Sequence, residues 1–497
     1  MRKKSNESKW STIVFLSAVV TFFMVSSSLA DNLWEGDESN EWTTPGNWSL
    51  GHVPDWGDGW IVVSNAGTVN CDTSLGSAGW AQYLWEACDT TDTTIEFNLG
   101  PESAGQHFGT SKQYVIGSSP GYTSTTNLNS GDLKIGMGSA GDRRLYLQGT
   151  GTAVFNASGN SYLFHRGMRI GQTAGGTGIF TLSDNARHET WGDIWIGNQG
   201  TGTLNIEGGS FDILGGTYLD VGVFNDGQLI VTGGQLNITA GSLLLGDEPG
   251  VTGTLTISAG RVNPKYITAG LDGNGIINVN GGELWTNNWI ALGSIQSAGV
   301  GGTGTLNVSG GHVACGSSSL VIGEATDGAG GGHGILNQTG GLIGIYSNNS
   351  SLILGEIDGA TPAQSAEVNL LGGETYSWAP PLVNMGWVNI DGGKLHMNFY
   401  KIQDLGGPSV IESMITAGQI KGADTDTDPS NFRIRVEQDS ENPFGDKTYM
   451  VQYPIPACES RVFPNLYPYE ENVTLKTNET TNIEYTIMNY GESESFN

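Results

Sequence analysis

The sequence predicts an all-β protein: a parallel β-helix, or β-solenoid, of about nine to ten coils, with an N-terminal cap and a small C-terminal β module. Two observations predict this fold. A glycine-punctuated repeat of about 24 residues runs from about Gly131 to Leu395. Within each unit apolar and polar residues alternate as in strands, and apolar residues do not follow the i, i+3, i+4, i+7 spacing of helices.

The repeat unit is clearest at Ile194–Gly197 followed by Gly202–Gly209, where one apolar stretch closes on Gly and the next on Gly-Gly. The glycines that close the first stretch recur at intervals of 26, 25, 24, 24 and 23 residues: Gly171, Gly197, Gly222, Gly246, Gly270 and Gly293. A unit of this length accommodates three short strands with turns, but not the four strands of a propeller blade. One solenoid turn per unit therefore fits best.

Residues 1–30 have the order of a secretory signal peptide: four basic residues, an apolar stretch from Ile13 to Val25, and the small residues of Ser28-Leu29-Ala30. The apolar stretch is short for a membrane span. We therefore expect a secreted or cell-surface, extracytoplasmic protein that is not integral to the membrane after signal cleavage, with an uncleaved anchor as the alternative.

The remaining chain divides into three parts. Residues 31–125 are rich in Trp and are predicted to form an N-terminal β cap module, because a solenoid needs its first coil covered. Residues 126–400 hold the solenoid. Residues 401–497 are expected to contain a linker and a small β module, with a short helix at Ser409–Ala417 and strands at Phe432–Val436, Val473–Leu475 and Ile483–Ile487.

The chain carries a net charge of −29, and removal of residues 1–30 leaves 17 basic against 49 acidic side chains, a net charge of −32. A surface this acidic repels nucleic acid and other polyanions, so we expect no nucleic-acid partner. An extracellular polysaccharide or a cell-envelope component is the expected partner class.

Several repeat units contain an asparagine between two apolar residues, as in Leu204-Asn205-Ile206. Strand alternation turns the apolar residues to one side and Asn to the other. Because successive coils lie about 4.8 Å apart, stacked Asn side chains can form a hydrogen-bonded amide ladder. The residues predicted to form this structural ladder are Asn205, Asn278, Asn307, Asn337, Asn369 and Asn389.

The middle residue of the first strand should also point outward. It changes from charged or aromatic in the early coils (Lys134, Arg169) to apolar in the later ones (Leu244, Val321, Ile353). An apolar outer face is unusual for a solvated solenoid, so we expect the C-terminal segment or a second protein to cover it.

Four cysteines are present: Cys71, Cys88, Cys315 and Cys458. Export makes disulfides plausible, and Cys71 with Cys88 is a candidate pair that would close a short loop. Cys315 with Cys458 would tie the C-terminal segment to the late coils. Free thiols are equally consistent with the sequence.

The N-terminal part supplies a resemblance. The order Leu33-Trp34-Glu35-Gly36, Glu41-Trp42, Asn47-Trp48 and Gly51-His52-Val53-Pro54 resembles the opening of secreted bacterial right-handed β-helix proteins with autotransporter-associated or adhesin-like β-strand repeats. The Gly-Thr-Leu-x-Ile-x-Gly-Gly units are similar to their passenger repeats. The resemblance covers residues 33–395 and implies a right-handed β-helix exported to the cell surface or the medium.

No residue pattern predicts catalysis. His333 occupies a position filled by Thr303 in another coil. In Gly117-Ser118-Ser119-Pro120-Gly121, which has the letters of a nucleophile elbow, Pro120 lacks the backbone N–H that the residue after the serine must supply. Arg166 and Arg169, near His165 and His188, form the only local basic cluster and are interpreted as a solvated edge. No metal site and no cofactor are predicted, beyond weak calcium binding by the acidic surface.

Tryptophans in or beside the coils suggest glycan binding without catalysis, because exposed indoles stack on flat sugar faces. The candidate glycan-binding residues are Trp191, Trp195, Trp285, Trp289 and Trp378. Together these observations favour an exported structural, adhesive or glycan-binding solenoid. The alternative is a polysaccharide-degrading hydrolase or lyase on the same scaffold.

Overall fold

The computed structural model describes residues 30–454 except 56–57, 65, 73–79, 102–106, 140, 217, 295–300, 326–331, 349, 358–364 and 439–446. The expected signal peptide up to residue 29 lies outside the described residues. So do Cys458 and the strands expected at Val473–Leu475 and Ile483–Ile487.

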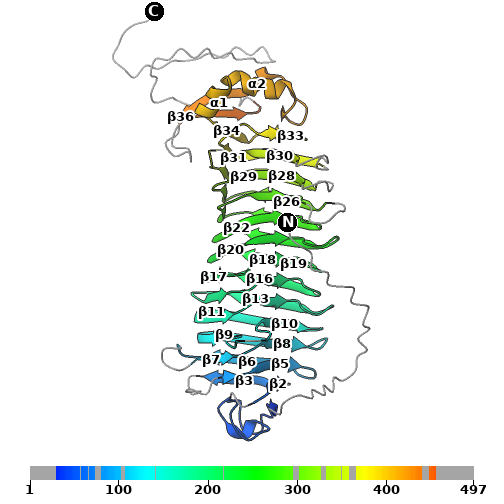
Figure 1. Ribbon diagram of the computed structural model, residues 1–497, viewed down its shortest axis with the longest axis vertical. Helices are drawn as coiled ribbons and strands as arrows, with labels where there is room; N and C mark the ends of the chain where they lie inside the picture. Colours follow the sequence, from blue (N-terminus) through cyan, green and yellow to red (C-terminus); the bar gives the residue numbers. More distant parts are fainter. Residues whose placement is uncertain are drawn as a thin grey trace, which may run out of the picture. The chain divides into compact units, whose positions relative to one another are not determined.

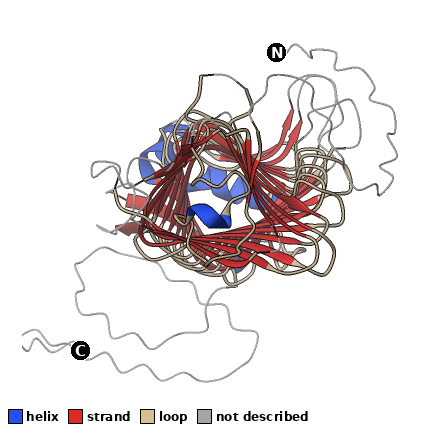
Figure 2. Ribbon diagram, turned by 90° about the horizontal axis from the view of Figure 1, so that it is seen from below, coloured by secondary structure: helices blue, strands red, loops and turns tan. Residues whose placement is uncertain are grey.

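The chain folds as the predicted right-handed parallel β-solenoid, with about 12 turns instead of nine to ten. Figure 1 shows the coils stacked in chain order from the N-terminal to the C-terminal part. Seen along the stack in Figure 2, the strands lie on three sides of the interior. We call these sides the first, second and third face, in the order in which each coil follows them.

The first face contains β2 (Trp60–Ser64), β5 (Tyr83–Cys88), β8 (Tyr114–Ser118), β10 (Leu145–Gly149), β12 (Met168–Ile170), β15 (Ile194–Ile196), β18 (Tyr218–Val221), the second half of β20 (Gln235–Leu245) and of β22 (Arg261–Ala269), β25 (Ile290–Leu292), β28 (Leu320–Ala325), β30 (Leu352–Ile357) and β32 (Leu382–Val383). At the N-terminal end β1 (Asn32–Leu33) pairs with β2.

The second face contains β3 (Gly67–Asp72), β6 (Thr93–Asn98), the first half of β9 (Thr123–Lys134) and of β11 (Thr152–His165), β13 (Thr177–Leu182), β16 (Thr201–Ile206), β19 (Gly227–Val231), β21 (Thr252–Ile257), β23 (Asn274–Val279), β26 (Thr303–Val308), the first half of β29 (His333–Ile345) and of β31 (Ser365–Ser377), β33 (Trp387–Ile390) and β35 (Ile420–Gly422).

The third face contains β4 (Trp80–Ala81), β7 (Phe108–Thr110), the second halves of β9 and β11, β14 (Arg187–Thr190), β17 (Ser210–Ile213), the first halves of β20 and β22, β24 (Glu283–Thr286), β27 (His312–Cys315), the second halves of β29 and β31, and β34 (Lys394–Asn398).

Parallel pairing in register places equivalent residues of successive coils above one another. On the first face, for example, Ile170, Ile196 and Val221 are paired in turn, and all three are buried. Each fully buried Leu or Ile side chain contributes roughly 1.5–3 kcal/mol relative to exposure. The core is therefore a set of apolar columns that run along the whole stack.

The repeating glycines occupy the corners. Gly197, after β15, has φ of 75°, and a Cβ there would lie 2.4 Å from the carbonyl oxygen of Asn225 in the next coil. Gly234, between the second and third faces, has φ of 62° and an equally close backbone neighbour, Gly208. Only glycine combines the left-handed backbone with this close approach, which explains the sequence repeat.

The predicted amide column lies on the second face. Asn307 donates to the side-chain oxygen of Asn278 at 2.9 Å, Asn337 to Asn307 at 3.1 Å, Asn369 to Asn337 at 3.0 Å and Asn389 to Asn369 at 3.3 Å. These bonds join five successive coils. Asn205 lies in the same column, but its amide reaches the hydroxyl of Thr181 at 3.4 Å instead of another Asn.

The N-terminal cap is smaller than the sequence suggests. Buried Trp42 packs against Trp48 with ring centroids 4.7 Å apart and against Phe108 of the second coil at 5.4 Å, which covers the end of the stack. Strands of residues 60–125 pair in parallel with the coils that follow them. The cap therefore gives way to the solenoid near Trp60 and not near residue 125. The sequence pattern did not reveal these first coils, because they turn without the regular Gly-Gly punctuation.

The described C-terminal part closes the other end. Helices α1 (Phe399–Leu405) and α2 (Pro408–Thr416) bury Ile402 and Ile411, and α2 is the short helix expected before Gly418. β37 (Lys447–Gln452) pairs antiparallel with β34 and with β36 (Arg433–Gln438), the strand expected near Phe432–Val436. No described helix is long and apolar enough to cross a membrane.

The candidate disulfide between Cys71 and Cys88 is not formed. Both thiols are buried and free, as is the thiol of Cys315. Cys71 pairs with Phe97 on the second face, whereas Cys88 pairs with Ser118 on the first face. The two thiols therefore belong to different faces of the solenoid.

The outward column of the first face differs in part from the expectation. Arg169, Leu244 and Val321 belong to it, but Lys134 projects from the third face, where it pairs with Phe164. Val321 is buried, and Leu244 is half-buried. The described part of the expected C-terminal cover pairs and packs at the end of the stack, and residues 455–497 lie outside the described residues.

Replacement of Asn337 by Ala should lower stability by about 1–3 kcal/mol, because it removes two inter-coil amide hydrogen bonds worth roughly 0.5–1.5 kcal/mol each. Chemical denaturation monitored by circular dichroism measures the change. Asn205→Ala is the matched control and should cost less, since its amide makes one longer bond. Equal losses in both variants would contradict a stabilising ladder.

Cys71, Cys88 and Cys315 should react with a thiol reagent such as Ellman's reagent only after denaturation, because each is buried and burial raises the pKa of each thiol. Counting titratable thiols before and after adding guanidinium, without reductant, checks this. Recovery of a peptide that joins Cys71 to Cys88 would contradict the free thiols.

Candidate functional site

The five candidate tryptophans do not form one site. Trp195 in β15 and Trp289 beside β25 lie on the first face, and Trp285 in β24 lies on the third. Trp191 follows β14 and Trp378 follows β31, both at the end of third-face strands but many coils apart. Any one binding surface therefore uses a subset of them.

The two first-face tryptophans are engaged by neighbours. The guanidinium carbon of Arg169 lies 3.7 Å from the centre of the Trp195 ring, and Arg169 is itself buried. Tyr266 packs against Trp289 with centroids 4.5 Å apart. Arg169 thus covers one side of Trp195, while Trp289 keeps 40% of its surface exposed.

Trp285 lies in a group of aromatic and polar side chains on the third face, which we call the Trp285 cluster: Arg261, Glu283, Trp285, His312 and Tyr346. The Trp285 ring lies 6.2 Å from the His312 ring and 6.0 Å from the Tyr346 ring. The Arg261 guanidinium lies 5.6 Å from the Trp285 ring. Four successive coils contribute these residues.

Register explains how these residues meet. Arg261, Glu283 and His312 follow one another in one outward column, and Trp285, Ala314 and Gly344 follow one another in the next. A Cβ at Gly344 would lie 2.0 Å from the Tyr346 ring, so Tyr346 folds back over Gly344 into the space that glycine leaves. Ala314 and Gly344 are both buried beside Trp285.

Hydrogen bonds hold the rings in place. His312 Nε2 lies 2.6 Å from the Tyr346 hydroxyl, and Trp285 Nε1 donates to the side-chain oxygen of Asn287 at 3.3 Å. Burial lowers the pKa of His312, so the imidazole is neutral at pH 7, and burial raises the pKa of Tyr346 to about 12. Both side chains can therefore exchange hydrogen bonds with neutral hydroxyl groups.

The charged members of the Trp285 cluster form a weak pair. Arg261 Nε lies 3.6 Å from a Glu283 carboxylate oxygen, with both side chains more than 40% exposed. Such an exposed pair contributes little stability, so its polar atoms remain available to a ligand. Aromatic faces with nearby hydrogen-bonding groups are suited to stacking against sugar rings.

The other residues considered for catalysis occupy structural positions. His333 begins β29, where it contacts Ser365 in the adjacent coil through Nδ1. Ser118 ends a buried strand, and Ser119 donates to Asp89. Among the described residues no group of three or more His, Cys, Asp or Glu side chains is arranged to hold a metal ion.

His165 and His188 point into the core, away from the basic edge. Their Nε2 atoms are 2.6 Å apart, and the Gly167 N–H donates to His165 Nδ1 at 3.1 Å. Because Nδ1 of His165 accepts a hydrogen bond, its ring proton is on Nε2, and this N–H donates a hydrogen bond to Nε2 of His188. Burial lowers the pKa of His165 to about 3 and lowers that of His188 well below its usual value, so both are neutral.

Sequence reasoning identified Trp285 but missed Tyr346, His312, Arg261 and Glu283. The only available signal was their register: His312 and Glu283 each follow a Gly-Gly corner, and Arg261 follows Ala259-Gly260 at the same offset. Tyr346 joins the cluster because it folds back over Gly344, which no spacing predicts.

Comparison with known proteins found no match: no protein-family profile, no curated protein and no solved structure resembles the chain closely enough to report. The fold alone defines the class to which the chain belongs, the right-handed parallel β-solenoids. The resemblance to adhesin-like repeats remains a prediction.

Stability should fall as the pH is lowered from about 6.5 toward 3, because the unfolded histidines bind protons that buried His165 and His188 do not. His188→Phe should reduce this pH dependence, since it removes one of the two buried bases from the stack that contains Phe211. Urea denaturation of the wild type and of His188→Phe at several pH values measures the pH dependence of the free energy of unfolding.

Phe211→Leu is the control for that experiment. It also disturbs the stack but removes no titrating group, so it should lower stability by a similar amount at every pH. An unchanged pH dependence in His188→Phe would show that the histidine pair is not responsible for it.

Proposed function

We propose that this chain is exported and acts at the cell surface or in the medium as a glycan-binding β-solenoid. Its ligand would be a neutral polysaccharide held by the Trp285 cluster. The observation that carries this proposal is the grouping of the half-buried side chains of Trp285, His312 and Tyr346 on the outer side of the third face.

The physical basis is stacking combined with hydrogen bonding. A sugar ring presents an apolar face to an indole and hydroxyl groups at its edge. Trp285 supplies the flat surface, while His312 and Arg261 supply polar atoms on either side of it. Because the coils fix all three side chains in register, binding requires little ordering of the protein.

Charge favours a neutral ligand at this position. The cluster has one cation, Arg261, and one carboxylate, Glu283, so its own charges cancel. The whole chain carries a net charge of −29, which repels polyanions. A polysaccharide with neutral sugars escapes this repulsion.

Hydrolysis is the alternative, but the cluster does not favour it. Glycoside hydrolases generally use two carboxyl groups placed on either side of the scissile bond. Of the five residues that form the Trp285 cluster, one, Glu283, carries a carboxylate. We therefore propose binding without cleavage at this position.

Trp285→Ala should weaken binding to the preferred neutral polysaccharide by about tenfold or more, since loss of one stacked ring costs on the order of 1.4 kcal/mol or more. Affinity electrophoresis in gels that contain xylan, mannan, mixed-linkage glucan or soluble chitin derivatives identifies the ligand and measures the change. Reducing-end release by wild-type protein in the same polysaccharides is recorded in parallel.

Trp289→Ala is the matched control, because Trp289 is a half-exposed indole on another face. Retention that is lost in Trp289→Ala and kept in Trp285→Ala would place binding on the first face and refute the proposed site. Sugar release by the wild type would replace the binding proposal with hydrolysis.

A further inference from the structure

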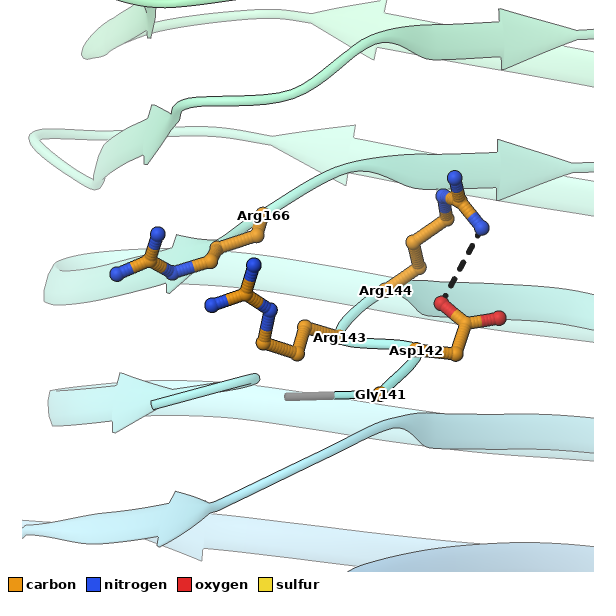
Figure 3. Close-up of a pocket in the computed structure, with 5 residues that line it drawn as sticks. All are labelled: Gly141, Asp142, Arg143, Arg144 and Arg166. Carbon is orange, nitrogen blue, oxygen red and sulfur yellow. Dashed lines mark hydrogen bonds and ion pairs between the residues drawn. The ribbon is translucent and has the colours of Figure 1, made fainter. Parts of the chain in front are cut away.

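A second surface feature lies between the third and first faces of the early coils. A pocket of about 350 Å³ is lined by Gly141, Asp142, Arg143, Arg144 and Arg166. Figure 3 shows Arg143 and Arg166 extending in the same direction from neighbouring coils, while Arg144 turns toward Asp142. We call it the arginine pocket.

Coil stacking brings the three arginines together. Arg143 and Arg144 directly precede β10, and Arg166 lies at the corresponding corner of the next coil, between β11 and β12. The Arg166 backbone N–H donates to the Arg143 carbonyl oxygen at 3.3 Å. Gly167 leaves room for the Arg144 side chain, because a Cβ there would lie 3.2 Å from Arg144 Cγ.

The positive charge in the pocket is compensated in part. Arg144 pairs with Asp142 at 3.2 Å. Arg143 donates to the carbonyl oxygen of Gly138 at 3.0 Å, and the Nε of Arg166 is buried without a hydrogen-bond partner. Within the part of the chain that the structure describes, no carboxylate forms an ion pair with Arg143 or Arg166.

The neighbourhood adds to this positive potential. Arg169 lies one strand away, and burial together with the charge of Arg144 lowers its pKa to about 10. Lys112 lies on the other side, where its side chain would meet a Cβ placed at Gly141 at 3.5 Å. These cations gather on a chain that has 21 basic against 50 acidic residues, and the Asp142 and Asp193 carboxylates act on Arg144 in the same neighbourhood.

We propose that the arginine pocket binds an acidic sugar residue, with the carboxylate of a uronate or a sulfate ester held between Arg143 and Arg166. Guanidinium groups bind such oxyanions through paired N–H donors. An anion in this position supplies the acceptor that Arg166 Nε lacks and reduces the repulsion between the two side chains.

The size of the pocket argues for a sugar and not for a bare ion. A volume of about 350 Å³ lies within the usual range for small-molecule sites, and the Asp142 carboxylate and the Arg144 guanidinium line it beside the other two arginines. This site uses different residues on a different part of the surface from the Trp285 cluster. It does not depend on the function proposed for that cluster.

The test compares matched charged and uncharged polymers by affinity electrophoresis of the full chain: dextran sulfate against dextran, and polygalacturonate against its methyl ester. We expect retardation by at least one charged polymer and not by its neutral counterpart, with binding that weakens as NaCl is raised. Arg166→Gln and Arg143→Gln should each weaken binding by about tenfold or more.

Arg166→Lys keeps the charge but loses the paired donors, so it should bind with intermediate strength. Arg187→Gln is the control, because Arg187 is an exposed arginine that pairs with Glu189 outside the pocket, and it should bind as the wild type does. Thermal melting of each variant confirms that it is folded.

Binding to dextran sulfate alone identifies a sulfate ester as the ligand, and binding to polygalacturonate alone identifies a carboxylate. The proposal is overturned if neither charged polymer retards the wild type. It is also overturned if Arg166→Gln, Arg143→Gln and Arg187→Gln all weaken binding equally, which would show general charge attraction. Trp285→Ala should leave this binding unchanged, so the two sites can fail separately.

Discussion

Parallel hydrogen bonding between successive coils is the interaction on which the other features of this protein depend. It places each residue directly above its equivalent in the coil before, about 4.8 Å away. Each outward or inward position therefore forms a column of stacked side chains along the solenoid. The apolar columns of the core and the amide column from Asn278 to Asn389 are examples. The same pairing requires tight corners, which accounts for glycines such as Gly197.

This constraint explains which parts of the fold could be predicted from sequence. Glycine punctuation and strand alternation were sufficient to predict the solenoid, because both are visible within a single repeat unit. The first coils were assigned to a separate module because residues 60–125 lack that punctuation, although they pair in the same way. Lys134 was placed on the wrong face because β9 continues around a corner at Ser130 without interruption.

The functional surfaces were harder to predict, because they join residues from different coils. Trp285 was identified as a candidate glycan-binding residue, but its partners depend on register across four coils and on the way Tyr346 folds over Gly344. Likewise, Arg143 meets Arg166 only because two corners are stacked. Both sites lie on the outside of the coils, since the interior is filled by the apolar columns.

Hydrogen–deuterium exchange followed by mass spectrometry tests most directly whether a single stack runs from Trp60 to the C-terminal helices. If the account is right, backbone amides in β5, β8 and β10 exchange slowly and at rates comparable to those in β16 and β19, because all are held by the same inter-coil pairing. Rapid exchange throughout residues 60–125, with protection confined to residues 126–400, would contradict it and restore a separate N-terminal module.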